Sequence, residues 1–265
     1  GAPGDLRAFL IRDTSYLDRT RPDGTYTYLV LAMDLAGNLS LPSDEAEATV
    51  AEIRALGRQA RAFHADLLHE AQVQALVPAA TAALGPLTVL VNSASIFEYD
   101  RIDTATREGW DRHIESNLRA PYVLTQAFAR QCPPATTDDT GEPLAQGLIV
   151  NMIDQRILKL TPEFSTYTIA KMGLWALTQT AAQGLAPHIR VNAIGPGPTL
   201  RGARQSETHF ARQRAATVLG RGANPQDITA ALGFFLDSPG VTGQFIAVDG
   251  GQHLGWKTPD VLGVE

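Results

Sequence analysis

From residue 44 onward, short apolar runs alternate with longer segments whose apolar residues recur at helical spacing. The clearest runs are LTVLVNSAS (87–95), GLIVNMID (147–154) and HIRVNAIGPGP (188–198), and each stops at small polar or turn-forming residues. Continuous apolar runs of this length are typical of parallel strands that are buried on both faces. Their alternation with helices predicts an α/β fold, a doubly wound parallel sheet with helices on both sides. Polar residues at the strand ends should therefore converge on one crevice at the carboxyl edge of the sheet.

The remaining predicted elements continue this alternation. Residues 44–57 place apolar Val50, Ile53 and Leu56 at helical spacing, and their acidic residues fall in the first turn, where the helix dipole favours them. The expected helices are 44–57, 69–85, 103–131, 165–186 and 225–237, and the expected strands are 60–67, 87–95, 147–154, 188–198 and 243–251.

Composition excludes several classes of function. The formal net charge of −6 disfavours nucleic acid or an anionic membrane as the main partner. A single cysteine, Cys132, makes no intrachain disulfide and no cysteine-based zinc site, so we predict no metal centre. The chain has no run of about 18 apolar residues that could span a membrane and no signal peptide pattern. These features favour a cytoplasmic protein.

The sharpest chemical signal is a tyrosine, Tyr167, four positions before a lysine, Lys171, on the predicted helix 165–186. This spacing puts both side chains on one face of the helix. An ammonium beside a phenol stabilises the phenolate, so we expect Lys171 to lower the pKa of Tyr167 and make it a general acid near neutral pH. Asp154 ends the preceding strand and should meet the pair at the mouth of the sheet. An isolated pair of this kind could also be a surface tyrosine and lysine.

The run NMID…YTIAKMGLWALTQTAAQGLAPHIRVNAIGPGP resembles the short-chain dehydrogenase/reductase family, and most closely its pteridine reductases. Those reductases carry Asp, as at Asp154, where most of the family has Ser, and LVNSASIF (90–97) resembles their LVNNAS-x-F segment. The resemblance covers residues 44–265. It implies a Rossmann-like fold and hydride transfer from NADPH, or from NADH, to a C=N or C=O carbon of a small molecule such as a pterin. It also implies a homotetramer formed through helices 103–131 and 165–186.

The resemblance implies a role for individual residues. Tyr167 would donate a proton, Lys171 would lower its pKa and bind the nicotinamide ribose, and Asp154 would orient the phenol and the substrate. Asn117 would hold a proton-relay water, and Phe97 would stack on a planar substrate. Cofactor contacts are implied for Asp66, Leu67, Asn92, Ser93, Ala94, Tyr167, Lys171, Pro196 and Gly197.

Ordinary structural explanations remain open for three of these residues. Asp154 could cap a turn, Asn117 could satisfy backbone groups inside a helix, and Phe97 could belong to the core. Residues 199–215 correspond to the family's mobile substrate loop, so no regular element is expected there.

Residues 1–43 do not resemble the start of this family. The family begins with a strand, a T-G-x-x-x-G-x-G loop and a helix, and the loop brings backbone N–H groups to the cofactor phosphates. No such loop occurs here. Residues 18–44 instead resemble the end of a fibronectin type III module, and the alternation around Tyr26 and Tyr28 predicts an antiparallel strand. We therefore divide the chain into an atypical segment, 1–43, that replaces the first strand-helix-strand, and a reductase-like domain, 44–265.

Two further alternatives concern this segment. YLVLAM (28–33) could be the first strand and LAGNLSLPSDE (35–45) its phosphate loop, although the single Gly37 leaves little room for a close backbone approach. Asp34 would then accept a ribose hydroxyl and favour NAD, or else lie in a solvated turn. Loss of the glycine-rich loop predicts weak cofactor binding. The rival to a reductase is therefore a catalytically impaired or non-enzymatic remnant or chimera.

Overall fold

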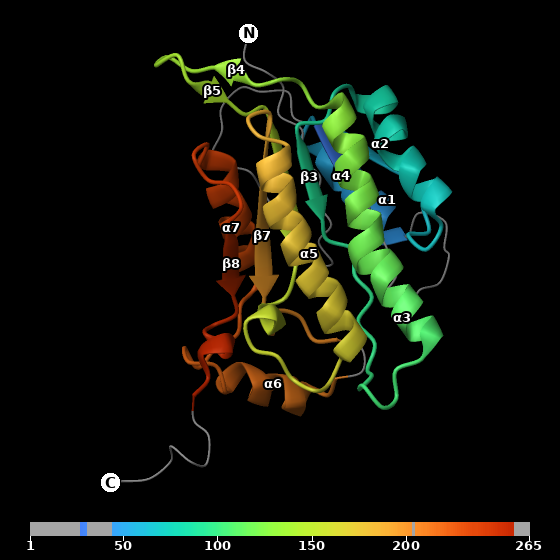
Figure 1. The fold of residues 1–265 in the computed structure, drawn as a ribbon, viewed down its shortest axis with the longest axis vertical. Helices are drawn as coiled ribbons and strands as arrows, with labels where there is room; N and C mark the ends of the chain where they lie inside the picture. The colour runs from blue at the N-terminus through green and yellow to red at the C-terminus, as the bar shows by residue number, and fades with distance from the viewer. Residues whose placement is uncertain (1–26, 31–43, 203–204, 257–265) are drawn as a thin grey trace.

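A computed structural model of the chain describes residues 27–30, 44–202 and 205–256 (Figure 1). Its strands are β1 (Thr27–Val30), β2 (Gln59–Ala62), β3 (Val89–Asn92), β4 (Thr136–Thr137), β5 (Pro143–Leu144), β6 (Gly147–Met152), β7 (Ile189–Pro196) and β8 (Phe245–Val248). Its α-helices are α1 (Asp44–Ala55), α2 (Glu70–Leu84), α3 (Arg107–Ile114), α4 (Ala120–Gln131), α5 (Ser165–Gly184), α6 (Glu207–Ala215) and α7 (Pro225–Asp237). A π-helix, η1 (Glu115–Arg119), joins α3 to α4, and two 3-10 turns are η2 (Gln155–Ile157) and η3 (Gln252–Leu254).

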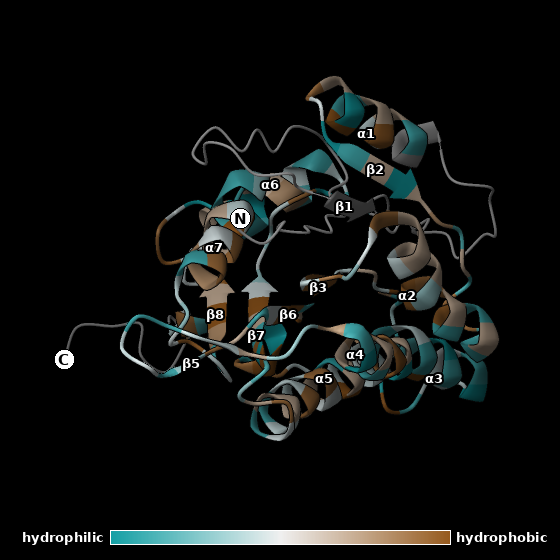
Figure 2. Cartoon of the chain, turned by 90° about the horizontal axis from the view of Figure 1, so that it is seen from above, coloured by the Kyte–Doolittle hydropathy of each residue, from teal (hydrophilic) through white to brown (hydrophobic). Residues whose placement is uncertain are grey.

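The centre of the fold is a parallel sheet with the strand order β3-β6-β7-β8. Adjacent residues of β6 pack against opposite faces of this sheet. Ile149 belongs to a core cluster with Phe128 of α4, whereas Val150 belongs to a cluster with Phe235 of α7. Helices α4 and α5 accordingly cover one face and α7 covers the other (Figure 2). Burial on both faces explains the continuous apolar runs of the sequence and confirms the predicted fold class.

The strand β1 corrects one expectation about the N-terminal segment. It pairs with β2 in parallel, with Thr27 opposite Gln59 and Val30 opposite Ala62, so the predicted antiparallel strand is wrong. Helix α1 connects the two strands and contacts both. A parallel pair needs such a crossover, whereas an antiparallel pair would be joined by a short turn. The pair lies on the β3 side of the four-stranded sheet (Figure 2). Asp34 and the possible phosphate loop 35–45 fall largely outside the described residues.

A helix and a two-stranded hairpin occur where the sequence predicted no regular element. Helix α6 lies within the segment 199–215 that was expected to be a loop, and the Ser206 hydroxyl caps it by accepting a hydrogen bond from the His209 N–H at 3.1 Å. Strands β4 and β5 form a small antiparallel hairpin ahead of β6. Among the described helices, none is long and apolar enough to cross a membrane.

Candidate active site

Three of the predicted catalytic groups meet where β6 ends against α5. The Tyr167 hydroxyl donates a hydrogen bond to Asp154 Oδ2 at 2.9 Å. Asp154 Oδ1 accepts the Arg156 N–H at 2.7 Å, which caps η2 and fixes the carboxylate. Lys171 Nζ donates to the Met152 carbonyl at 2.8 Å. Tyr167 and Lys171 are 5% and 2% exposed, so the surface-pair alternative is wrong.

The pKa values of this cluster are set mainly by burial. Burial raises the pKa of Tyr167 well above its ordinary value, and the charge and hydrogen bond of Asp154 add to the increase, whereas Arg156 and Ser95 oppose it. Burial also raises the pKa of Asp154. Burial lowers the pKa of Lys171 to about 8, and the charge of Asp154 opposes this decrease.

These pKa shifts overturn the expectation that Lys171 lowers the pKa of Tyr167. The Lys171 ammonium lies 5.7 Å from the centroid of the phenol ring, and its hydrogen bond goes to the Met152 carbonyl. The phenol instead faces a carboxylate, which disfavours the phenolate. Tyr167 is therefore held as a protonated donor.

Phe97 reaches this cluster from the segment that follows β3. Its ring stacks on Phe164, with centroids 4.2 Å apart, and meets Tyr167 edge-on at 4.7 Å. Phe164 adopts a left-handed conformation, with φ of 57° and ψ of 47°, immediately before α5. Such a conformation is costly for a bulky residue and is often found at ligand sites. Phe97 remains 41% exposed, so it is a poor fit to a pure core role.

Asn117 lies in the π-helix η1 and is fully buried. Its side-chain amide accepts the Ile96 N–H and donates to the Ile96 carbonyl, both at 2.8 Å. The side chain therefore anchors the segment that carries Phe97. Pro121 has no N–H, so the Asn117 carbonyl lacks its normal α-helical donor four residues later. If Asn117 holds a water, this backbone carbonyl is the group available to do it.

The predicted adenosine contacts lie after β2 and β3. Asp66 accepts the Leu68 N–H at 2.9 Å and meets His69 Nδ1 at 2.7 Å, while Leu67 belongs to the core. The Asn92 amide donates to Asn151 Oδ1 at 2.8 Å, and its own Oδ1 is buried with no hydrogen-bond partner among the described residues. Ser93 and Ala94, which follow β3, are partly exposed. Within the described part of the chain, the side-chain hydrogen bonds of Asp66 go to Leu68 and His69, neither of which contacts Tyr167 or Asp154 through a hydrogen bond.

Pro196 is the last residue of β7, and Gly197 follows it. The Gly197 N–H donates to the Val248 carbonyl at 3.0 Å, and a Cβ at Gly197 would lie 2.5 Å from Asp249 Cβ, so only glycine fits. One residue before Pro196, a Cβ at Gly195 would lie 3.2 Å from the Asp154 backbone carbon. This close approach brings the end of β7 against the residue that binds the Tyr167 hydroxyl.

Sequence reasoning missed several residues that touch this site. Arg156 lies over the Phe164 ring at 5.0 Å and influences Tyr167, and His113 meets the Tyr167 ring at a centroid distance of 6.0 Å. No motif singles out Phe164, because its role comes from a backbone conformation. Arg156 could have been suspected from its place two residues after Asp154 at a strand end.

Comparisons with known proteins identify the family to which this chain belongs. A sequence model of the enoyl-(acyl carrier protein) reductase family matches residues 39–253. A short-chain dehydrogenase/reductase of Armillaria gallica is 31% identical over 233 residues, which cover 82% of this chain and 85% of the relative.

Two solved structures extend the likeness to three dimensions. FolM alternative dihydrofolate reductase 1 from Brucella canis, crystallised with NADP, is 38% identical, with a TM-score of 0.78 over 90% of this chain and 88% of that chain. A short-chain dehydrogenase from Burkholderia cenocepacia, also in complex with NADP, is 28% identical, with a TM-score of 0.74 over 87% and 88% of the two chains. The protein therefore belongs to the short-chain dehydrogenase/reductase family, and its fold is that family's Rossmann-like fold.

Proposed function

We propose that the protein is an NADPH-dependent reductase of planar heterocycles such as pterins or dihydrofolate, with Tyr167 as the proton donor. The observation that carries this proposal is the hydrogen bond of 2.9 Å from Tyr167 to Asp154, at a strand end beside the Phe97 ring. A buried phenol on a carboxylate can deliver a proton, and an adjoining aromatic ring can bind a flat substrate by stacking. The likeness to an alternative dihydrofolate reductase supports this substrate class.

The nicotinamide half of NADPH fits the residues that the structure describes. Lys171 is buried, and its ammonium has three donors but makes one hydrogen bond, to Met152, within the described part of the chain. Buried donors need acceptors, and ribose hydroxyls would satisfy the remaining two. When bound, the cofactor supplies the hydride. NADH remains the alternative, because the segment that would choose between them is atypical.

The chain's own residues handle the proton. Reduction of a C=N or C=O bond consumes one hydride and one proton, and the Tyr167 hydroxyl would give that proton to the substrate nitrogen or oxygen. The Ser95 hydroxyl and the Arg156 charge favour the phenolate that remains. Asp154, whose pKa is raised, can return a proton to the phenolate, because a carboxyl with a raised pKa carries protons closer to neutral pH. A water on the Asn117 carbonyl would extend this path.

A rival role follows from residues 1–43, which contain no glycine-rich phosphate loop. A chain that keeps catalytic side chains without a diphosphate site would be a non-enzymatic remnant or chimera, with the boundary proposed near residue 43. Titration with NADPH, followed by its fluorescence, separates the two roles. Saturable binding at micromolar NADPH supports the reductase, and no binding at millimolar NADPH supports the remnant.

The catalytic assignment is tested with Tyr167→Phe, assayed with NADPH and either dihydrofolate or dihydrobiopterin. Loss of the proton donor should lower kcat about 10²- to 10⁴-fold while NADPH affinity is retained. Tyr122→Phe on α4 is the matched control, because it removes the hydroxyl of a tyrosine that takes no part in the Tyr167–Asp154 hydrogen bond, and it should keep the wild-type rate. A Tyr167→Phe variant with wild-type turnover would refute the assignment.

A further inference from the structure

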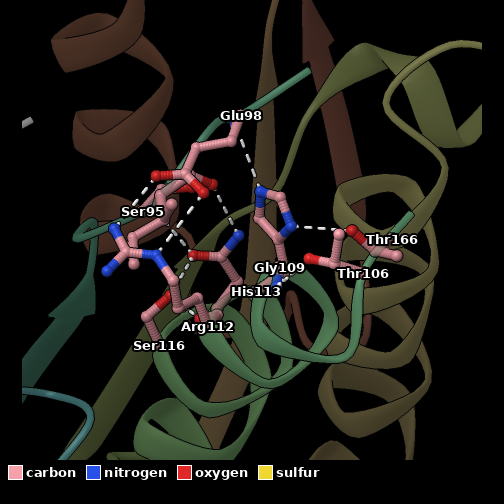
Figure 3. Close-up of polar contacts among 10 residues, drawn as sticks. Ser95, Glu98, Thr106, Gly109, Arg112, His113, Ser116 and Thr166 are labelled. Atoms are coloured by element: carbon pink, nitrogen blue, oxygen red, sulfur yellow. Dashed lines mark hydrogen bonds and ion pairs between the residues drawn. The ribbon is translucent and has the colours of Figure 1, made fainter. Parts of the chain in front are cut away.

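His113 is a buried histidine on α3 whose ring is bonded on both sides. It is 1% exposed. Nδ1 lies 2.7 Å from the Thr166 hydroxyl of α5, and Nε2 accepts the Glu98 N–H at 3.1 Å (Figure 3). Neither contact belongs to the proton path described above. A buried histidine with two such partners has a defined orientation and a defined protonation state.

The neighbouring donors and acceptors allow a single tautomer of this ring. The Thr166 hydroxyl donates its proton to the Asp100 carboxylate in a short hydrogen bond, so towards His113 it offers lone pairs only. Nδ1 must therefore carry the hydrogen and donate to Thr166. The Glu98 backbone N–H can only donate, so Nε2 must be a bare acceptor. The ring is neutral and protonated at Nδ1.

These bonds place the ring between the two halves of the proposed site. Thr166 is the residue before Tyr167, and Glu98 is the residue after Phe97. On the other side of Phe97, Asn117 holds both backbone groups of Ile96 at 2.8 Å. The backbone on both sides of Phe97 is thus hydrogen-bonded to the continuous helix α3–η1, through His113 of α3 and Asn117 of η1.

We propose that His113 is a positioning residue, whose neutral ring fixes Phe97 and Tyr167 in their relative positions at the substrate site. This inference rests on the proposed reductase function, because the substrate is what these positions serve. His113 itself would touch neither substrate nor cofactor. It acts through the Glu98 N–H and the Thr166 hydroxyl.

Protonation of His113 would undo this arrangement. A hydrogen on Nε2 would point at the Glu98 N–H, so this bond would be lost and the segment carrying Phe97 released. Burial lowers the pKa of His113, as does Arg112 on α3, while Asp100 and Glu98 on the segment after β3 oppose them. From α5 the ring faces the uncharged Thr166 and Tyr167. The neutral form should therefore persist below the ordinary titration range of histidine.

The test compares His113→Phe, which keeps a ring but no polar group, with His113→Asn, which keeps a donor near Nδ1. With dihydrofolate and NADPH, the Phe variant should raise KM about 10- to 100-fold, the range expected for losing a buried hydrogen bond and leaving its partner unpaired. Affinity for NADPH should stay the same in His113→Phe. The KM of His113→Asn should lie between those of His113→Phe and the wild type. His188→Phe is the matched control, because His188 also accepts a loop N–H, from Ala135 at 3.0 Å, beside the β4–β5 hairpin. It should leave KM unchanged.

Three results would overturn the inference. The first is a KM for dihydrofolate that is unchanged in His113→Phe. The second is a loss of NADPH affinity in His113→Phe as large as the increase in KM, and the third is a KM in His113→Asn no lower than in His113→Phe. If His113→Phe does not fold, the Asn variant and the wild type still decide the question.

A readout on the wild-type protein separates this inference from the proposed function. Nitrogen NMR of labelled histidines should show a neutral ring protonated at Nδ1 whose signal disappears in His113→Asn. The signals of His69 and His253, whose Nδ1 atoms also lie within hydrogen-bond distance of carboxylates, should remain. A charged ring or the other tautomer at neutral pH would contradict the positioning role even if the enzyme reduces dihydrofolate. Failure of the wild type to reduce dihydrofolate or dihydrobiopterin would instead refute the proposed function.

Discussion

Lys171 carries a charged ammonium in a buried environment that disfavours the charge. It is 2% exposed, makes no ion pair within 4.0 Å in the described part of the chain, and has a pKa lowered to about 8 by burial. A charge in such a place destabilises the fold, because water solvates it better than a single carbonyl does. Proteins accept costs of this kind at functional sites. This argues that Lys171 is present for binding or catalysis.

Lys171→Met should therefore stabilise the protein while abolishing reductase activity. At pH 7 the gain in the free energy of unfolding should be on the order of 1–3 kcal/mol, since methionine fills similar space without a charge. Above pH 8 the folded lysine loses its proton, whereas the unfolded lysine keeps it up to its ordinary pKa of 10.5. The unfolded state then binds more protons, so wild-type stability rises with pH and the advantage of the variant shrinks.

Urea unfolding at pH 7 and pH 9.5 measures this difference. Lys159→Met is the control, because Lys159 is an exposed lysine that also donates to a carbonyl, that of Gly255 at 3.3 Å. Its stability difference from wild type should not change with pH. A less stable Lys171→Met variant at pH 7 would show that the ammonium has a compensating partner.

The residues of the site show what spacing can predict and what it cannot. Tyr167 and Lys171 were found because spacing of four residues on a helix fixes a common face, and Asp154 because it ends a buried strand. The direction of the Tyr167 pKa shift was missed, because it depends on which atom each side chain reaches, and Lys171 reaches Met152 instead of the phenol. The left-handed backbone at Phe164 also has no sequence signal.

At the scale of elements, the alternation of strands and helices was predictable wherever burial is two-sided. Residues 225–237 form α7 with both predicted ends, and their start has the expected physical cause, a capping box at Asn224 followed by Pro225. Helix α6 was missed because none of its residues is buried, so it carries no apolar stripe. Hydrogen bonds from Arg214 connect it to residues outside the helix.

Arg214, near the end of α6, makes hydrogen bonds to the segments on both sides of the helix. Its guanidinium donates to the carbonyls of Pro198, Ala223 and Gly222 and to the Asn224 side chain, at distances of 2.6 to 3.2 Å. Lysine cannot reproduce this fork. Arg214→Lys should therefore speed amide hydrogen exchange in α6 about tenfold, which is the effect of losing roughly one net hydrogen bond.

Exchange followed by mass spectrometry measures this effect, with α7 as the internal reference. Arg212→Lys, on the exposed side of the same helix, should leave exchange unchanged. Equal exchange in the two variants would show that α6 does not depend on this clamp. Because Pro198 directly follows Gly197, a loosened α6 should also raise substrate KM.

For the whole molecule, the N-terminal segment shows where sequence reasoning reached its limit. The alternation around Tyr26 and Tyr28 predicts an antiparallel strand, and the structure has a strand at Thr27–Val30. The partner is the parallel β2, reached through α1. A strand of four residues does not reveal its neighbour, because pairing direction depends on the connection and not on the strand's own residues.

The faces of α4 and α5 suggest how whole molecules associate. The two helices lie side by side over the sheet (Figure 1). Tyr122 on α4 is 42% exposed, and Ile169 and Met172, three positions apart on α5, are 44% and 40% exposed. Apolar side chains gathered on neighbouring helices favour a protein interface. We therefore propose that these faces form the homo-oligomer, a tetramer by family resemblance.

Charges placed on this face should dissociate the oligomer. Ile169→Glu with Met172→Glu would bury two unpaired carboxylates in the interface, a cost that an association of ordinary strength cannot offset. Light scattering after gel filtration should give four times the chain mass for the wild type and a smaller assembly for the double variant. Leu56→Glu, at the residue after α1, where Leu56 is 54% exposed, should keep the wild-type mass. A wild type that elutes as a single chain at every concentration would contradict the proposal, since these side chains would then be exposed without a partner.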